Sequence, residues 1–459
     1  MLFNSGTFVV FFTAFLGLYW LVRGSVAWRN RLIVLASWGF YGAWDWRFLP
    51  LLVGSSLVDY HLGIAVEQAR APWRTRLVAL SVVLNLGLLA VFKYFDFFAG
   101  SLATMITRLG GTPDWPTLNI ILPVGISFYT FQSLGYVLDV HRGRVAACRD
   151  PTAFLAYVAF FPQLVAGPIE RAAHLLPQFA STRVITAGAI REGLWRILVG
   201  LFRKVVVADS CGRVADLAFA QDRFTGPGVW VAVVAFSLQV YGDFAGYSDI
   251  ARGLGRLLGF ELRVNFAEPY LAASIRDFWH RWHMSLSEWL RDHVYLPLGG
   301  NRFGHARTVA HLMITMLLGG LWHGAAWHFV VWGAWHGLGL SSRTLWPVAL
   351  PAALGRMLTL VFVGLGWLWF RAPEIGTASR MFAALPELTA PIWLGSACIQ
   401  LVWFGLPALA LDLMARGTRG PDWGATLGTG SRMAIQGALL FAILCYWRGD
   451  GPPFIYFQF

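Results

Sequence analysis

Long apolar segments, separated by short loops rich in arginine, recur from one end of the chain to the other. Hydrophobic residues make up 57% of the 459 residues and charged residues only 13%, a balance that does not suit a water-soluble protein. A bilayer can be crossed only by helices or closed barrels, because backbone polar groups find no water there. The alternating strands of about ten residues that form a barrel do not occur. The sequence therefore predicts an all-α, polytopic membrane protein.

The apolar segments predict about ten or more membrane segments, some of them short or re-entrant. Spans are expected over residues 6–22, 32–44, 47–66, 77–98, 118–140, 228–259, 354–370, 392–414 and 432–447. The first segment lacks a basic leader and a cleavage site, so we expect a retained span and not a signal peptide. The second and third segments meet at Asp45, where we expect a hinge.

Arginines recur in the loops at alternate crossings. The loops 23–31, 67–76 and 141–150 each carry three arginines, whereas Arg108 is the only basic residue near the loop between the second and third of them. By the positive-inside rule these loops are expected in the cytoplasm, with the N-terminus outside. The formal net charge of +12 then indicates loops that face anionic lipid. No basic patch with interleaved aromatic residues predicts a nucleic-acid partner.

The pattern of long spans is interrupted after residue 151. The run 160–171, FFPQLVAGPIER, is apolar but too short to span, and its prolines and Gly167 predict a re-entrant segment buried in protein. Residues 188–208 mix basic residues with an apolar face, which is typical of an interfacial helix. We expect a single membrane domain over residues 1–459, with N-terminal spans in 1–150, re-entrant and interfacial segments in 151–210, a core in 228–340 and C-terminal spans in 354–459.

Histidines gather between Arg276 and Leu340, a stretch that holds eight of the eleven in the chain. His283 lies on an amphipathic segment and His323 in a glycine-rich apolar run. Burial of an imidazole in apolar surroundings costs free energy unless it is hydrogen-bonded, and a polar residue within a membrane suggests a functional site. Because histidine titrates near neutral pH, both are candidate general bases. The alternative for each is a hydrogen-bonded helix-packing residue.

Two other polar patterns leave alternatives open. His280 and His283 share one helix face, and an approach of His323, His328 and His336 to them would suit a haem or di-metal site. The sequence has neither HExxH nor Glu-x-x-His, so no bound metal or cofactor is expected. Asp243, within an apolar span, either bonds a neighbouring helix or lines a polar tunnel.

Several long stretches resemble the membrane-bound O-acyltransferase family. They are FWHRWHMSLSEWLRDHVYLPLGGNR (278–302), GLWHGAAWHFVVWGAWHG (320–337), and the segments 122–143, 160–171, 241–270 and 454–459. Together they cover almost the whole chain and are most similar to the bacterial polysaccharide branch, typified by the alginate O-acetyltransferase membrane protein. The resemblance implies an acyltransferase whose short and long helices surround a central tunnel.

The resemblance also implies roles for residues and partners. His323 falls on the family's catalytic histidine, and His283 on its second characteristic position. Acetyl-CoA in the cytoplasm would be the donor, and the chain would lie in the bacterial inner membrane. An extracytoplasmic partner of the SGNH-hydrolase type would place the acetyl group on a polysaccharide. Further candidate substrate-binding residues are Trp322, Asp243, His336 and, from its charge alone, Arg302.

This chain departs from the branch at two positions, with His280 in place of the usual arginine and Ala245 in place of a serine. Neither is one of the two candidate catalytic histidines. No fused acetyltransferase domain is expected after the last span. Alternatives are an O-acetyltransferase for peptidoglycan or another cell-envelope glycan, or a transporter or flippase without chemistry.

Overall fold

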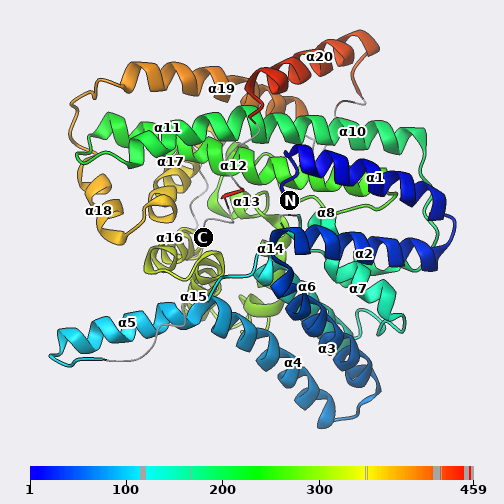
Figure 1. Cartoon of the computed structure of the whole chain (residues 1–459). Helices are drawn as coiled ribbons and strands as arrows, with labels where there is room; N and C mark the ends of the chain where they lie inside the picture. The colour runs from blue at the N-terminus through cyan, green and yellow to red at the C-terminus, as the bar shows by residue number, and fades with distance from the viewer. Residues whose placement is uncertain are drawn as a thin grey trace. The chain divides into compact units, whose positions relative to one another are not determined.

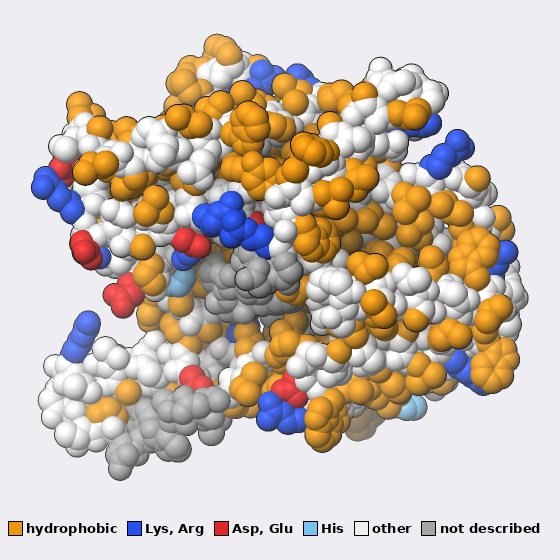
Figure 2. Space-filling view, turned by 45° about the horizontal axis from the view of Figure 1, so that its top comes forward, with side chains coloured by type: hydrophobic (Ala, Val, Ile, Leu, Met, Phe, Trp, Pro, Cys, Tyr) orange, Lys and Arg blue, Asp and Glu red, His pale blue; other side chains and the backbone are white. Residues whose placement is uncertain are grey.

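In a computed structural model, the chain is described over residues 1–113, 120–165, 167–346, 348, 350–416, 424, 426–448 and 454–455. These residues form helices joined by loops, and no strand occurs among them. Five helical runs are long and apolar enough to cross a membrane: Val26–Gln68, Trp73–Arg108, Gly226–Leu257, Ala352–Arg371 and Leu394–Ala415. Figure 2 shows hydrophobic side chains over much of the visible face. The all-α, polytopic membrane fold is confirmed, and the total number of spans stays a prediction.

Contacts within the chain divide it into two compact units. The first consists chiefly of Thr7–Val184, and the second chiefly of Ile185–His323 and Trp327–Phe459. Both candidate catalytic histidines belong to the second unit. That residues 1–459 form a single membrane domain stays a prediction.

The first unit is built from hydrophobic helices that buried polar groups connect. Its helices are α1 (Gly6–Val22), α2 (Val26–Asp45), α3 (Leu49–Gln68), α4 (Trp73–Leu89), α5 (Phe95–Arg108), α6 (Ile126–His141), α7 (Pro151–Ala159), α8 (Phe161–Leu164) and α9 (Ala172–Phe179). Asp59 on α3 accepts hydrogen bonds from Ser81 and Asn85 on α4, at 2.7 Å and 2.9 Å. In low-dielectric surroundings such satisfied polar groups fix which helices are neighbours.

The second unit holds the helices that carry the candidate site (Figure 1). They are α10 (Ala187–Leu201), α11 (Asp209–Phe219), α12 (Gly226–Leu257), α13 (Ile275–Trp279), α14 (Met284–Leu290), α15 (His305–His323), α16 (Trp327–Leu345), α17 (Ala352–Arg371), α18 (Ile375–Ala383), α19 (Leu394–Ala415) and α20 (Thr429–Tyr446). A π-helical stretch, Phe202–Ala208, joins α10 to α11. Figure 1 shows the joined helices running alongside α12.

Glycines let α10 and α12 approach until their backbones touch. A Cβ atom on Gly246 would lie 2.7 Å from the carbonyl oxygen of Gly200, and one on Gly253 would lie 2.6 Å from that of Gly193. No side chain fits at these distances, so only glycine permits the crossing. Such small-residue contacts are a common basis of helix association in membranes.

Two buried cations lie where this crossing continues. Arg203 pairs with Asp249 on α12 at 2.6 Å and with Asp412 on α19 at 2.7 Å. Lys204 pairs with Asp209 and with Asp243 on α12, both at 2.8 Å. Because each charge has partners, the low-dielectric interior tolerates them, and the pairs fix the position of α12. These contacts favour the helix-bonding alternative for Asp243 over a place in a tunnel wall.

Helices α15 and α16 form an antiparallel hairpin that also depends on glycine. Gly333 on α16 lies against the backbone of Met316 and Leu317, and a Cβ atom on Gly337 would lie 3.3 Å from the Cα atom of Met313. The two helices therefore run backbone to backbone. His323 at the end of α15 is brought close to the first turns of α16.

The structure corrects three expectations about helix positions. Arg29 is not a loop residue: α2 begins at Val26, and the buried Arg29 guanidinium donates to the carbonyls of Phe179 and Ser181. Residues 188–208 are not simply interfacial, because Arg203 and Lys204 are buried in ion pairs. In the predicted span 118–140, residues 118–119 lie outside the described part, and the helix begins only at Ile126, after Pro123 and the left-handed Gly125.

Other expectations hold. A turn of 3₁₀ helix, Trp46–Phe48, separates α2 from α3, and Asp45 caps it by accepting a hydrogen bond from the Arg47 N–H, so the hinge at Asp45 is confirmed. In the run 160–171, α8 ends after four residues and its side chains are buried. Helices α17, α19 and α20 lie within a few residues of the last three predicted spans. Helices α17 and α19 are among the five runs able to cross a membrane, whereas a crossing by α20 stays a prediction.

We predict that Gly246→Leu destabilises the second unit, because the added side chain would meet the α10 backbone. Overpacking of this kind costs about 1–3 kcal/mol or more. The melting temperature of the purified protein in detergent should fall. Gly437→Leu on α20 is the matched control, since a Cβ atom there has no neighbour within 4 Å. Equal melting temperatures for the two variants would contradict the close crossing.

Candidate active site

His323 ends α15 and lies in an aromatic enclosure. Its side chain is buried, and its ring centroid lies 5.1 Å from Trp322, 5.0 Å from Trp332 and 5.3 Å from Phe370. The ring of His283 lies 6.4 Å away, centroid to centroid. The structure thus brings together the two histidines that the sequence singled out.

His283 has a backbone conformation that a side-chain-bearing residue seldom adopts. Its φ of 43° and ψ of 52° are left-handed, immediately before α14 begins at Met284. Such a conformation costs about 1–3 kcal/mol and persists only where the surroundings impose it, often at functional sites. It directs a fully buried imidazole against Phe244 of α12, at 4.6 Å between centroids.

Asn265 sets the tautomer of His283. The Asn265 side-chain oxygen accepts hydrogen bonds from the backbone N–H and the hydroxyl of Ser285, at 3.3 Å and 2.9 Å. An atom that accepts from a backbone N–H must be the amide oxygen, so His283 Nδ1, 3.2 Å from it, must be the donor. The proton of a neutral imidazole then lies on Nδ1, and Nε2 keeps its lone pair.

His283 lies between α13 and α14, outside the five long apolar helical runs. Burial lowers the pKa of His283 to about 3, because no carboxylate offsets the loss of water. The ring is therefore neutral at physiological pH. A neutral imidazole that is held in one tautomer can accept a proton or a hydrogen bond at Nε2.

Two further predicted residues lie around the pair. Trp322 is buried and contacts His283 at 5.7 Å between centroids, in addition to His323. His336 on α16 is one aromatic ring further away, 4.8 Å from Trp332, which in turn contacts His323. Neither nitrogen of the fully buried His336 has a hydrogen-bond partner among the described residues. Trp322 thus forms part of the enclosure, whereas His336 lies behind it.

The structure does not bring the other two candidates to the histidines. The Asp243 carboxylate binds Lys204 and accepts the backbone N–H of Ile455 at 2.6 Å. Arg302 is exposed on the turn before α15, and no contact in the described part of the chain links it to either histidine. A substrate-binding role for these two residues stays a prediction.

The remaining histidines of this stretch have separate surroundings. His328 bonds the carbonyl of Trp369 at 3.0 Å, and the ring of His293 packs on Trp289 at 4.8 Å. Among the residues that the structure describes, no three His, Cys, Asp or Glu side chains converge as metal ligands would.

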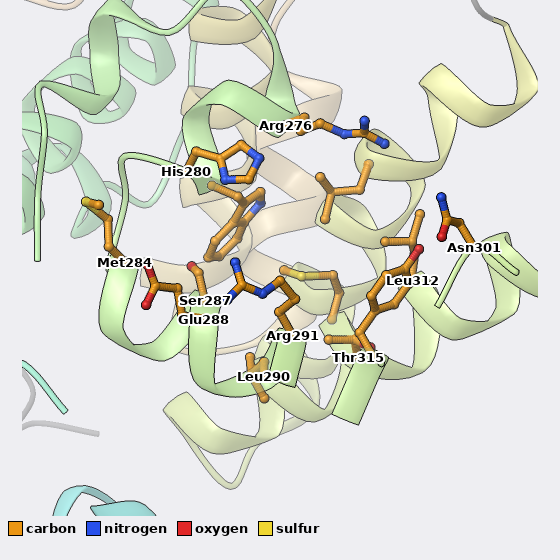
Figure 3. A pocket seen from close by; sticks show the side chains of 14 residues that line it. Arg276, His280, Met284, Ser287, Glu288, Leu290, Arg291, Asn301, Leu312 and Thr315 are labelled. Atoms are coloured by element: carbon orange, nitrogen blue, oxygen red, sulfur yellow. The ribbon is translucent and has the colours of Figure 1, made fainter. Parts of the chain in front are cut away.

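A cavity of about 340 Å³ has residues of α13, α14 and α15 in its lining, but neither His283 nor His323 lines it. Its lining includes Met284, which follows His283, and Thr315 and Met316 on the helix that ends in His323. Figure 3 shows Arg276 and His280 on one side of this cavity, away from Leu290. Its volume is in the range of small-molecule sites. Apolar side chains share the wall with polar ones, which include the basic Arg276, His280 and Arg291 and the acidic Glu288.

Sequence reasoning missed two residues in the irregular segment before α13. Asn265 carries no motif of its own, and only its contact with His283 reveals its role. Among the residues that the structure describes, Glu268 is the other side-chain-bearing one with a left-handed φ, 44°. Burial and the nearby charge of Asp412 raise the pKa of Glu268 to about 7. No periodic pattern indicates such positions, because the segment is neither helix nor strand.

Comparison with known proteins identifies the family. A model of the family described as "MBOAT, membrane-bound O-acyltransferase family" matches residues 149–359. A probable alginate O-acetylase of Pseudomonas putida is 39% identical, with both chains covered completely. The chain belongs to the membrane-bound O-acyltransferase family. It is an acyltransferase, and His283 and His323 lie within the matched region.

Other relatives are similar over most of their length. A probable alginate O-acetylase of Azotobacter vinelandii is 44% identical over 84% of this chain and 78% of its own. A peptidoglycan O-acetyltransferase of Helicobacter pylori is 35% identical over 84% of this chain and 80% of its own. The names of these relatives describe O-acetyl transfer, to alginate in one case and to peptidoglycan in the other.

We predict that Asn265→Ala lowers the rate of acyl transfer about tenfold to a hundredfold, because a buried hydrogen bond worth about 1–3 kcal/mol is lost and the tautomer is no longer fixed. Asn265→Asp keeps the acceptor and should restore much of the rate. The added carboxylate should also raise the pKa of His283 and shift the pH–rate profile to higher pH. Equal losses and an unchanged profile in both variants would show that Asn265 is not a positioning residue.

Proposed function

We propose that this chain transfers acetyl groups from acetyl-CoA in the cytoplasm to an extracytoplasmic polysaccharide of the alginate type. The observation that carries the proposal is the pair of buried histidines, His283 and His323, with ring centroids 6.4 Å apart. The names of the alginate O-acetylase relatives support the acceptor.

The two histidines would divide the chemistry between them. His323 takes the proton of the acceptor hydroxyl as its oxygen attacks the thioester carbonyl. The carbon–sulfur bond then breaks, and the thiolate leaves and receives the proton from His323. His283, neutral and protonated on Nδ1, accepts a hydrogen bond at Nε2 and orients the acceptor. Trp322, in contact with both rings, keeps water from the thioester.

The cavity lined by Arg276, His280 and Arg291 suits the donor. A coenzyme A thioester has an anionic phosphate end and a long, largely uncharged arm, which matches a cavity whose wall combines basic residues with apolar side chains. Arg302 on the nearby turn and Arg307 in the first turn of α15 favour a cytoplasmic position for this end of α15 by the positive-inside rule. In this account the phosphates meet Arg276 and Arg291, and Arg302 is not required.

In this proposal the chain lies in the bacterial inner membrane, and the acceptor is met on the extracytoplasmic side of that membrane. A separate extracytoplasmic acetyltransferase of the SGNH-hydrolase type would receive the acetyl group and place it on the polysaccharide. A second acceptor, peptidoglycan, is favoured by the Helicobacter pylori relative. The alternative of a flippase without chemistry has no support among the relatives named above, which are transferases.

The test uses purified protein in proteoliposomes with radiolabelled acetyl-CoA, together with the partner protein and either alginate or peptidoglycan fragments. We predict that His323→Ala lowers acetyl transfer about a hundredfold to ten-thousandfold, the usual cost of losing a general base. His305→Ala, at the exposed first residue of the same helix, is the control and should keep the wild-type rate. Near-normal transfer by folded His323→Ala protein would refute the assignment. Labelled peptidoglycan with unlabelled alginate would select the second acceptor.

A further inference from the structure

A second cavity in the same unit, here called the groove, also has Arg276 in its lining. Its volume is about 660 Å³, and it runs along α16 and α17. Leucine and valine side chains form much of its wall, among them Leu338, Leu358 and Val361, which are 60%, 46% and 38% exposed. In a membrane protein, a wall of exposed aliphatic side chains faces acyl chains and not water.

Two arginines from different helices line the groove. Arg343 lies in the last turn of α16 and Arg276 in α13, and both line the groove. Neither guanidinium forms an ion pair with any carboxylate in the described part of the chain, whereas the arginines deeper in the unit, such as Arg203, are paired. Arg276's neighbour Asp277 is already engaged by Arg281 at 2.8 Å. These two cations are therefore available to an anion from outside the chain.

The sequence that forms α15, α16 and α17 contains basic residues but no acidic ones. No aspartate or glutamate occurs between Asp292 and Glu374, while arginines occur at 302, 307, 343, 356 and 371. Because α15 and α16 run antiparallel, Arg343 returns to the same end of the hairpin as Arg302 and Arg307. By the positive-inside rule this end faces the cytoplasmic leaflet, which carries the anionic lipids.

We propose that this groove binds an anionic phospholipid of the cytoplasmic leaflet, with its phosphate between Arg343 and Arg276 and an acyl chain between α16 and α17. Basic pockets between helices on the cytoplasmic side are a recurring form of anionic lipid site. The aromatic side chain of Trp335, which stacks on Phe362 at 4.9 Å and donates to its carbonyl at 3.0 Å, gives the groove a rigid wall.

The backbone also shapes the groove where the acyl chain would lie. Gly339 and Gly355 both line it. A Cβ atom on Gly339 would lie 2.5 Å from the Phe362 ring, and one on Gly355 would lie 2.5 Å from the carbonyl oxygen of Ala273. At these two glycines the wall is packed backbone against neighbour, and a side chain there would disturb the wall that an acyl chain would contact. Arg276 is common to the groove and to the proposed donor cavity, so a bound lipid phosphate would compete with coenzyme A for this one guanidinium. Lipid binding can be measured without acetyl transfer.

The test measures lipid bound to purified full-length protein by native mass spectrometry, with added phosphatidylglycerol or phosphatidylcholine. Wild-type protein should retain phosphatidylglycerol in preference to phosphatidylcholine. Arg343→Gln should weaken retention of phosphatidylglycerol about fivefold, since one basic residue near an anionic headgroup contributes on this scale. Retention of phosphatidylcholine should not change. Arg343 is chosen because Arg276 also lines the proposed donor cavity.

Two further variants separate the headgroup from the acyl chain. Leu358→Trp fills the groove from an exposed position on α17 and should weaken both lipids while Arg343 is intact. Arg356→Gln is the matched control on α17, because Arg356 does not line the groove, and it should bind as wild type does. Glycerol phosphate, the headgroup without chains, should not displace phosphatidylglycerol at millimolar concentration.

Several results would overturn the proposal. Equal retention of the two lipids by wild type would remove the headgroup site. An equal loss in Arg343→Gln and Arg356→Gln would indicate diffuse charge attraction, and displacement by glycerol phosphate would indicate a soluble anion site. Wild-type retention in Leu358→Trp protein that elutes normally in size-exclusion chromatography would exclude the groove itself.

Discussion

The buried ion pairs of Arg203 and Lys204 hold the helix on which the candidate active site rests. Their partners on α12, Asp249 and Asp243, are the sequence neighbours of Ser248 and Phe244. Ser248 accepts a hydrogen bond from the Asn265 amide at 3.3 Å, and Phe244 packs against His283. The aspartates of α12 thus hold the helix in place through ion pairs, and the residues next to them contact Asn265 and His283. Removal of one member of a buried pair typically costs about 3–5 kcal/mol, so these pairs bear directly on the geometry of the histidines.

The site itself combines a rigid enclosure with one strained residue. Aromatic rings surround His323, and the left-handed conformation of His283 aims its ring at the same space. Asn265 selects the tautomer, and burial keeps the ring of His283 neutral. An imidazole that accepts a hydrogen bond from the acceptor must be neutral, and a thioester must be kept from water. The same burial provides both conditions.

Much of this was predictable from sequence, and the misses share one cause. The length of the apolar segments was enough to locate the long helices. The two histidines could be singled out because burial of an imidazole in apolar surroundings costs free energy unless it is hydrogen-bonded. Arg29, Arg203 and Lys204 were placed at loops or interfaces, as basic residues usually are. Their partners are remote: Arg203 and Asp412 are 209 residues apart, and no local pattern links them. Asn265 was missed for the same reason, since it acts in an irregular segment through a contact with His283.

In the proposed mechanism, His283 and His323 act on one acetyl group as a unit. The most direct measurement is a double-mutant cycle on the rate of acetyl transfer, with His283→Ala, His323→Ala and the double variant. Residues that serve one step together give losses that do not multiply. We therefore predict that the double variant is no slower than His323→Ala alone, within about twofold. A double variant whose loss equals the product of the single losses would show that the two histidines act independently, and would contradict the account.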